Sequence, residues 1–118
     1  MKTLLAALAL LASFATHAQS VTCTDAKQCE VMWSKAQQAI PMVSRMRIRL
    51  LTSDRIETYA PPTSAYTGAI VTKVPQGDGY VISLEPICGR MYTAREEEAC
   101  RDIDKAMKSV FAEFLTAK

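Results

Sequence analysis

Four arginines form the densest group of side chains in this sequence that could bind a ligand. They stand close together at Arg45, Arg47, Arg49 and Arg55. Alternate side chains of a β-strand share a face, so Arg47 and Arg49, together with Arg45, are expected along one face of a strand. Guanidinium groups bind carboxylates and phosphates through paired hydrogen bonds. With Tyr59 and Lys73, this row predicts a basic patch that contains an aromatic ring and suits an acidic partner.

The arginine row also has an interpretation that needs no partner. Arg49 can pair with Glu57 on the neighbouring strand, which would neutralise part of the row. Charged side chains on an edge strand also prevent association with other sheets. On this interpretation the row is a solvated sheet face.

Most catalytic chemistry is missing from the chain. The only histidine, His17, lies in a segment that we expect to be removed, and the cysteines are expected to be bridged, which excludes histidine and thiol catalysis. Carboxylates remain, and the candidates for an acid–base pair are Asp54, Glu57, Asp78 and Glu85. Turns favour aspartate at two of these positions, and Glu57 has an arginine partner. We therefore expect no enzyme and no cofactor.

The four cysteines predict two disulfides. They are Cys23, Cys29, Cys88 and Cys100, an even number in a chain with an export signal. A zinc site is the alternative, but there is no C-x-x-C spacing and no histidine beyond the leader to support it. Of three possible connectivities we favour Cys23 with Cys29 and Cys88 with Cys100. Each pair is close in sequence and flanks the start of a predicted helix.

The first 18 residues have the pattern of a cleavable signal peptide. Lys2 precedes an apolar stretch from Leu4 to Phe14, and small residues follow up to Ala18, where we expect the cut. The stretch is shorter than the roughly 20 apolar residues of a membrane span. Cys23 lies beyond the expected cut, which argues against a lipid anchor. The sequence therefore predicts a soluble protein of the periplasm or the extracellular space.

Cleavage would leave a single domain at 19–118, which is 118 minus 18, or 100 residues. Loss of Lys2 changes the formal net charge from +2 to +1. Such a small charge gives no field that would draw the protein to nucleic acid, so we expect no nucleic-acid partner.

Apolar residues at spacings of three and four predict a helix over 26–40. Asp25 is suited to cap it, Gln28 can reach back to the cap, and Pro41 is expected to end it. Trp33 lies in the apolar stripe, which favours a place in the core, although a ligand-stacking role is the alternative. A second helix is predicted over 94–116, with a capping box formed by Thr93 and Glu96.

Residues 46–59 alternate with a period of two and predict a hairpin. With a loop at 52–54, Leu50 would face Ile56, Arg49 would face Glu57, and Arg47 would face Tyr59. A second hairpin pairs 70–74 with 80–84 through the turn at 75–79, in which the Gly77–Gly79 segment could alternatively be a ligand loop. The predicted fold is α+β, a four-stranded antiparallel meander sheet with two helices packed on one face in the order α-β-β-β-β-α.

The sequence resembles a group of small, exported, uncharacterised proteins of Gram-negative bacteria with paired cysteines. The resemblance spans 23–88 and rests on Cys23, Cys29, Met32-Trp33, Thr52, Ile56-Glu57-Thr58-Tyr59, Val71-Thr72-Lys73, Pro75, Gly79-Tyr80, Ile82 and Cys88. The group usually places its last cysteine sooner than Cys100. No activity is attached to the group, so the resemblance implies export, disulfides and one domain but no functional residue.

The function that these observations favour is a noncatalytic periplasmic binding or adaptor module. Its expected partner is an envelope protein or an anionic envelope glycan, held at the open sheet face or at the loop from Pro61 to Gly68. The expected binding residues are Arg45, Arg47, Arg49, Tyr59 and Lys73. The alternative is an inhibitor or immunity-type protein that acts on an envelope enzyme through the stiff loop around Pro61 and Pro62. A small carboxylate enzyme is a third hypothesis, and it requires two carboxyl groups in one cleft.

Overall fold

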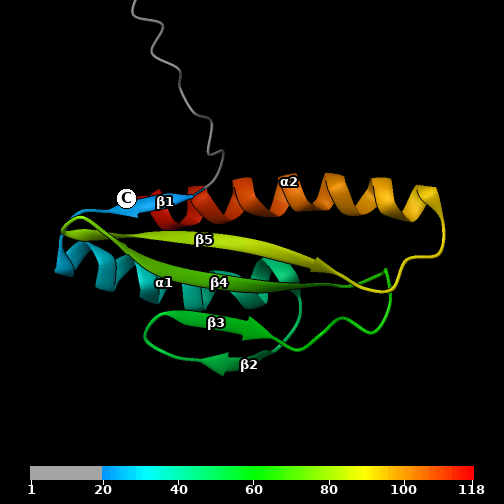
Figure 1. Cartoon of the computed structure of the whole chain (residues 1–118), viewed down its shortest axis with the longest axis horizontal. Coiled ribbons are helices and arrows are strands. Elements are labelled where there is room, and N and C mark those ends of the chain that lie inside the picture. The colour runs from blue at the N-terminus through cyan, green and yellow to red at the C-terminus, as the bar shows by residue number, and fades with distance from the viewer. Residues whose placement is uncertain (1–19) are drawn as a thin grey trace, which may run out of the picture.

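Two helices and a five-stranded antiparallel sheet form the part of the chain that the computed structural model describes, residues 20–118 (Figure 1). The expected signal peptide lies outside these residues. In chain order the elements are β1 (Val21–Cys23), α1 (Ala26–Ser44), β2 (Ile48–Leu51), β3 (Arg55–Thr58), β4 (Thr67–Gln76), β5 (Gly79–Cys88) and α2 (Ala94–Thr116). The strands are arranged in the order β1-β5-β4-β3-β2.

The α+β class is confirmed, but the prediction of four strands is wrong. The additional strand, β1, pairs antiparallel with β5, so that Val21 lies opposite Ile82 and Cys23 opposite Tyr80. Val21 and Cys23 are buried, whereas Thr22 between them is exposed. Three residues are too few to show the alternation by which a strand is recognised in a sequence. The partner strand, which is distant in sequence, is what makes this segment a strand.

One face of the sheet packs against both helices and forms the core. Ile56 lies opposite Val71, and Val71 lies opposite Leu84, so these side chains share a face. They pack with residues from α1 and α2 in one cluster, whose fully buried members include Ala36, Ile40, Ile56, Val71, Ile82 and Phe111. In Figure 1, α1 lies behind the strands and α2 runs along β1 and β5. On the opposite face of the sheet, Ile70 and Thr72 remain partly exposed.

Side-chain caps fix the start of both helices, as the sequence predicts. Asp25 accepts a hydrogen bond from the backbone N–H of Gln28 at 2.8 Å, and Thr93 accepts one from that of Glu96 at 3.2 Å. In each case the side chain of the residue three positions after the cap accepts a hydrogen bond from the backbone N–H of the residue before the cap, as Gln28 does from Thr24. The bounds of α2 are those expected.

The predicted end of the first helix at residue 40 is wrong, because α1 continues through Pro41 to Ser44. Proline costs a helix one backbone hydrogen bond and some strain. Here Pro41 is exposed, while Ile40 and Ser44 on either side of it are buried. Burial of the last turn of α1 therefore outweighs the tendency of proline to end a helix. The helix ends at Arg45, whose φ of 60° is left-handed.

The first hairpin has a tighter loop than expected. The backbone N–H of Thr52 donates to the carbonyl of Arg55 at 2.8 Å, which leaves two residues in the loop, and the Thr52 hydroxyl donates to Asp54 at 2.8 Å. Leu51, not Leu50, therefore lies opposite Ile56, so the predicted register is wrong near the loop. An irregularity between Ile48 and Leu50 absorbs the extra residue.

The β4–β5 hairpin is longer than the strands predicted for it. Its ten pairs run from Thr67 opposite Cys88 to Gln76 opposite Gly79. The two-residue turn begins with Gly77 at a φ of 61°, a conformation that glycine adopts without strain. The turn is thus formed by Gly77 and Asp78 alone, within the 75–79 segment expected for it, because residues 75, 76 and 79 belong to the strands.

Both disulfides have the favoured connectivity. Cys23 is bonded to Cys29 and Cys88 to Cys100. The first bond joins β1 to the first turn of α1, and the second joins the end of β5 to α2. Each bridge therefore ties the start of a helix to the sheet against which it packs.

Substitution of Gly79 by alanine tests the fifth strand. A Cβ atom at Gly79 would collide with the backbone carbonyl of Cys23, so G79A should push β1 away from β5 and lower the free energy of unfolding by about 1–3 kcal/mol. Hydrogen exchange at the β1 amides should accelerate. D78A, one residue earlier in the exposed turn, is the control. Equal exchange in the two variants would contradict the pairing of β1 with β5.

Candidate functional site

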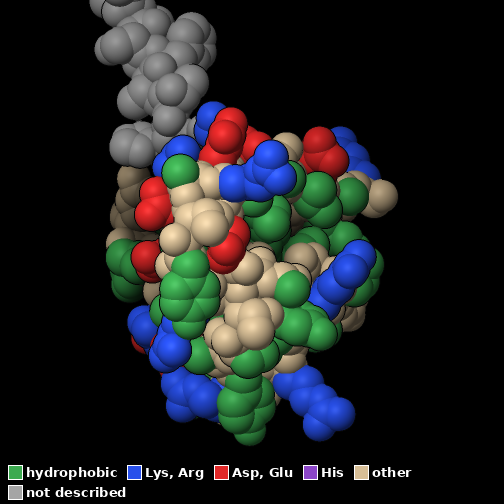
Figure 2. All heavy atoms as spheres, turned by 90° about the vertical axis from the view of Figure 1, so that its right-hand side faces the viewer, with side chains coloured by type: hydrophobic (Ala, Val, Ile, Leu, Met, Phe, Trp, Pro, Cys, Tyr) green, Lys and Arg blue, Asp and Glu red, His purple; other side chains and the backbone are tan. Residues whose placement is uncertain are grey.

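Arg47 and Tyr59 are paired at one end of the first hairpin, and Arg45 stands two residues before Arg47 at the end of α1; we call these three residues the arginine surface. Arg45 ends α1, Arg47 leads into β2, and the backbone N–H of Tyr59 donates to the Arg47 carbonyl at 3.0 Å. Both arginines are exposed, and Tyr59 is 53% exposed. Within residues 20–118, neither guanidinium lies within ion-pair distance of a carboxylate. Figure 2 looks onto this end of the molecule and shows basic side chains gathered around hydrophobic ones at the bottom.

Arg49 is not counted in the arginine surface, because its guanidinium is already in an ion pair. Glu57 accepts hydrogen bonds from Arg49 at 2.7 Å and from Arg55 at 2.9 Å. The hydrogen bond from Arg55, with the charges of both arginines, lowers the pKa of Glu57 and outweighs the opposing effect of burial. For Arg49, the interpretation that needs no external partner therefore applies, because this arginine is already paired with Glu57. Glu57 also pairs with Arg55.

Lys73 lies apart from the arginine surface. It is on β4, on the face that packs against the helices, and its backbone N–H donates to the carbonyl of Asp54 at 2.8 Å. Asp54 is in the loop of the first hairpin, whereas Arg47 and Tyr59 are at the other end of that hairpin. The predicted five-residue patch is thus divided into the arginine surface, the Arg49 ion pair and Lys73.

Lys73 instead joins two aromatic rings. Its ammonium nitrogen is 5.0 Å from the centroid of the Trp33 ring and 5.0 Å from that of the Tyr80 ring. Trp33 is only 6% exposed, and its indole N–H donates to the carbonyl of Thr52 at 3.2 Å, so its predicted place in the core is confirmed. The rest of the ring lines a surface pocket.

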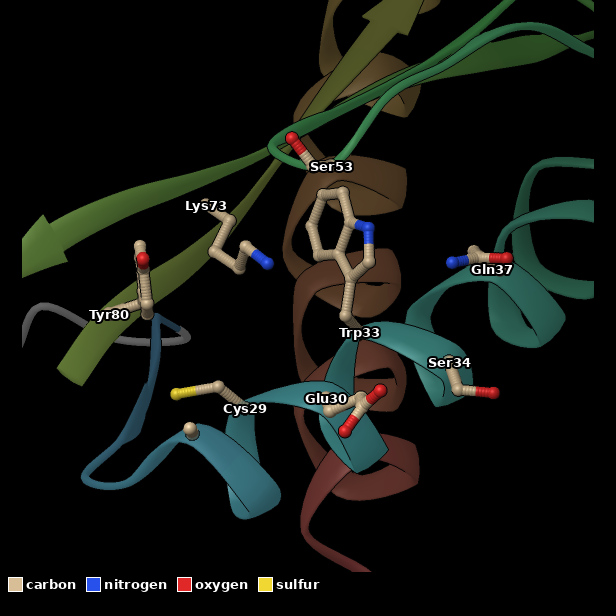
Figure 3. A pocket seen from close by; sticks show the side chains of 9 residues that line it. Cys29, Glu30, Trp33, Ser34, Gln37, Ser53, Lys73 and Tyr80 are labelled. Carbon is tan, nitrogen blue, oxygen red and sulfur yellow. The ribbon is translucent and has the colours of Figure 1, made fainter.

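This pocket lies between α1, the β4–β5 hairpin and the loop of the first hairpin (Figure 3). It has a volume of about 540 Å³. Trp33, Lys73 and Tyr80 line it, together with hydrogen-bonding side chains of α1. The sequence did not reveal this pocket, because its residues come from three segments. The only signal was the position of Lys73, which shares the alternation of Ala69 and Val71 and therefore points to the helices.

The four candidate carboxylates do not form a pair in one cleft. Asp54 accepts from Thr52 in one turn, and Asp78 lies in the other. Glu57 and Glu85 both lie opposite Ile70, on strands at either side of it, and so are two strands apart. Within the described residues, no three histidine, cysteine, aspartate or glutamate side chains gather closely enough to hold a metal ion.

Comparisons of the chain with protein-family models, curated proteins and solved structures found no match. The resemblance to small exported proteins therefore remains a prediction. Neither helix in residues 20–118 has the length and apolar character needed to span a membrane.

The ion pairs of Glu57 should make stability depend on pH. Because the pKa of Glu57 is lowered on folding, its charged form stabilises the folded state above the ordinary glutamate value of about 4.3, and this stabilisation is lost as the pH falls through the lowered pKa. E57Q should lower the urea midpoint at pH 7, and the difference from wild type should shrink below about pH 4. E85Q on the same face is the control. A constant difference at all pH values would contradict the assignment.

Proposed function

We propose that this protein is a noncatalytic binding module of the periplasm or the extracellular space that holds an acidic partner at the arginine surface. The observation that carries the proposal is the pair of exposed arginines, Arg45 and Arg47, that have no carboxylate partner among the described residues. The two disulfides are consistent with an oxidising compartment.

The arginine surface suits a row of carboxylates. Arginine binds planar carboxylates with two parallel hydrogen bonds, and such charge-assisted bonds contribute about 1.5–3 kcal/mol each. Tyr59 adds an exposed ring that can pack on the apolar part of a side chain or on a sugar ring. The surface is built on the end of α1 and on the β2–β3 hairpin, so the backbone of the three residues is held before a partner arrives.

An inhibitor of an envelope enzyme is the second candidate, and one observation favours it. The loop at 60–66 is mostly exposed, yet a turn from Tyr66 to Thr63 closes it, and Gly89 packs directly against the Thr63 carbonyl. A loop that is already ordered loses little entropy when it enters an active site. Inhibition of a peptidoglycan hydrolase or an envelope protease that P62G abolishes would favour this candidate over the adaptor.

Charge reversal at the arginine surface tests the adaptor function. We expect R45E/R47E to weaken the binding of a glutamate-rich peptide or of a polyuronate oligosaccharide at least about tenfold, because each lost charge-assisted bond is equivalent to about that factor. Isothermal titration calorimetry at several salt concentrations measures the effect, and the two probes distinguish a protein partner from a glycan.

R95E/R101E is the matched control for this experiment. Both residues are exposed on α2, and the double substitution changes the net charge of the protein by the same amount. Equal weakening by the two double variants would show that binding follows net charge. That result, or the absence of saturable binding of both probes to the wild type, would reject the arginine surface as the binding site.

A further inference from the structure

We infer that the pocket between α1 and the β4–β5 hairpin is a second binding site, for a small zwitterion such as a free amino acid or a peptide of two or three residues. In this assignment Lys73 binds the carboxylate of the ligand and Glu30 binds its ammonium group. The inference does not depend on the arginine surface, which lies at the other end of the first hairpin.

The dimensions of the pocket suit a small molecule. Its volume of about 540 Å³ falls within the usual range of roughly 300–1,000 Å³ for small-molecule sites. Its walls belong to regular elements, α1 on one side and β4 and β5 on the other. The bridge between Cys23 and Cys29 anchors the start of α1 to β1, next to this pocket. The site is therefore formed without a ligand.

Lys73 supplies a cation with unused hydrogen-bonding capacity. Its ammonium group lies between the rings of Trp33 and Tyr80 and points into the pocket (Figure 3). Ring faces attract the charge but accept no conventional hydrogen bond. Within residues 20–118, no carboxylate lies within ion-pair distance of this nitrogen. An ammonium held in this way is suited to bind the carboxylate of a ligand.

Glu30 places the opposite charge on the wall of the same pocket. It projects from α1, on the side of the pocket across from β4 (Figure 3). Its carboxylate is more than 4.0 Å from the Lys73 ammonium, because the two form no ion pair. Because both side chains line the same pocket without pairing with each other, we assign the carboxylate of the ligand to Lys73 and its ammonium group to Glu30.

The charges of the lining decide between a zwitterion and a simple anion. Lys73 and Glu30 are the charged residues of the lining, so their formal charges cancel. A doubly charged anion such as phosphate would face one attractive and one repulsive group. Ser34, Gln37 and Ser53 add neutral hydrogen-bonding groups that suit peptide N–H and C=O groups. A short peptide with free ends matches this arrangement.

Binding can be followed at Trp33, the single tryptophan of the chain, through its indole N–H signal in nuclear magnetic resonance spectra. We expect alanyl-alanine to shift this signal saturably in the full-length protein. Acetylation of the peptide's amino end, or amidation of its carboxyl end, should each raise the dissociation constant at least about tenfold. These comparisons use the wild-type protein and do not depend on the folding of a variant.

Three variants assign the contacts. K73M keeps an apolar side chain against the rings and should weaken the binding of alanyl-alanine about tenfold or more. K105M on α2 should leave the binding unchanged. E30Q should weaken the binding of the free peptide but not that of the acetylated peptide, because the acetylated peptide lacks the ammonium group that Glu30 would bind. Failure of alanyl-alanine to bind, equal effects of K73M and K105M, or phosphate binding that E30Q strengthens would each overturn the inference.

Discussion

Burial of one side of the β4–β5 hairpin under the two helices is the constraint on which the rest of the structure depends. In a strand, successive side chains point to opposite faces, so the burial of Val71 and Ile82 fixes the direction of every other residue in the hairpin. Lys73 follows Val71 on the same side, but near the end of the core, where Trp33 and Tyr80 leave an opening. The residues that alternate with them, such as Thr72 and Glu85, face away from the helices.

The two disulfides act on the same constraint from outside the core. Each joins the start of a helix to a strand, over sequence separations of 6 and 12 residues. On the chain-entropy model, rings of this size stabilise a protein by roughly 2–3 kcal/mol each. A domain of this length buries a modest core, so these contributions are a substantial part of its stability. The bridge between Cys23 and Cys29 also keeps α1, which forms one wall of the pocket, in place beside β1.

Local patterns in the sequence were sufficient for much of the fold. The cap at Thr93 and the apolar stripe that follows predicted α2 to the residue, and the spacing of the cysteines favoured the pairing found. These features depend on neighbours within a few turns of chain. Other features depend on contacts with distant segments or on a side-chain bond within a turn. These are the strand β1, the continuation of α1 through Pro41 and the register near Leu51. Residue propensities contain no information about such contacts.

The candidate sites show the same division. The alternation of residues 46–59 predicted Arg47, Arg49, Arg55 and Tyr59 on one hairpin, but it could not show that Glu57 would bind both Arg49 and Arg55 or that Arg45 would end α1. It also grouped Lys73 with the arginines, although the packing of β4 against α1 places this lysine beside Trp33. A pocket formed by three segments becomes visible only when the segments are assembled.

A comparison of I82A with I70A tests the central constraint most directly. The two isoleucines are on adjacent strands; Ile82 is fully buried against the helices, and Ile70 is partly exposed on the other face. Urea unfolding should show that I82A lowers the free energy of unfolding by about 2–5 kcal/mol and that I70A lowers it clearly less. Equal losses would mean that the helices do not cover the face we assign to them, and the arrangement of the core and of the pocket would be wrong.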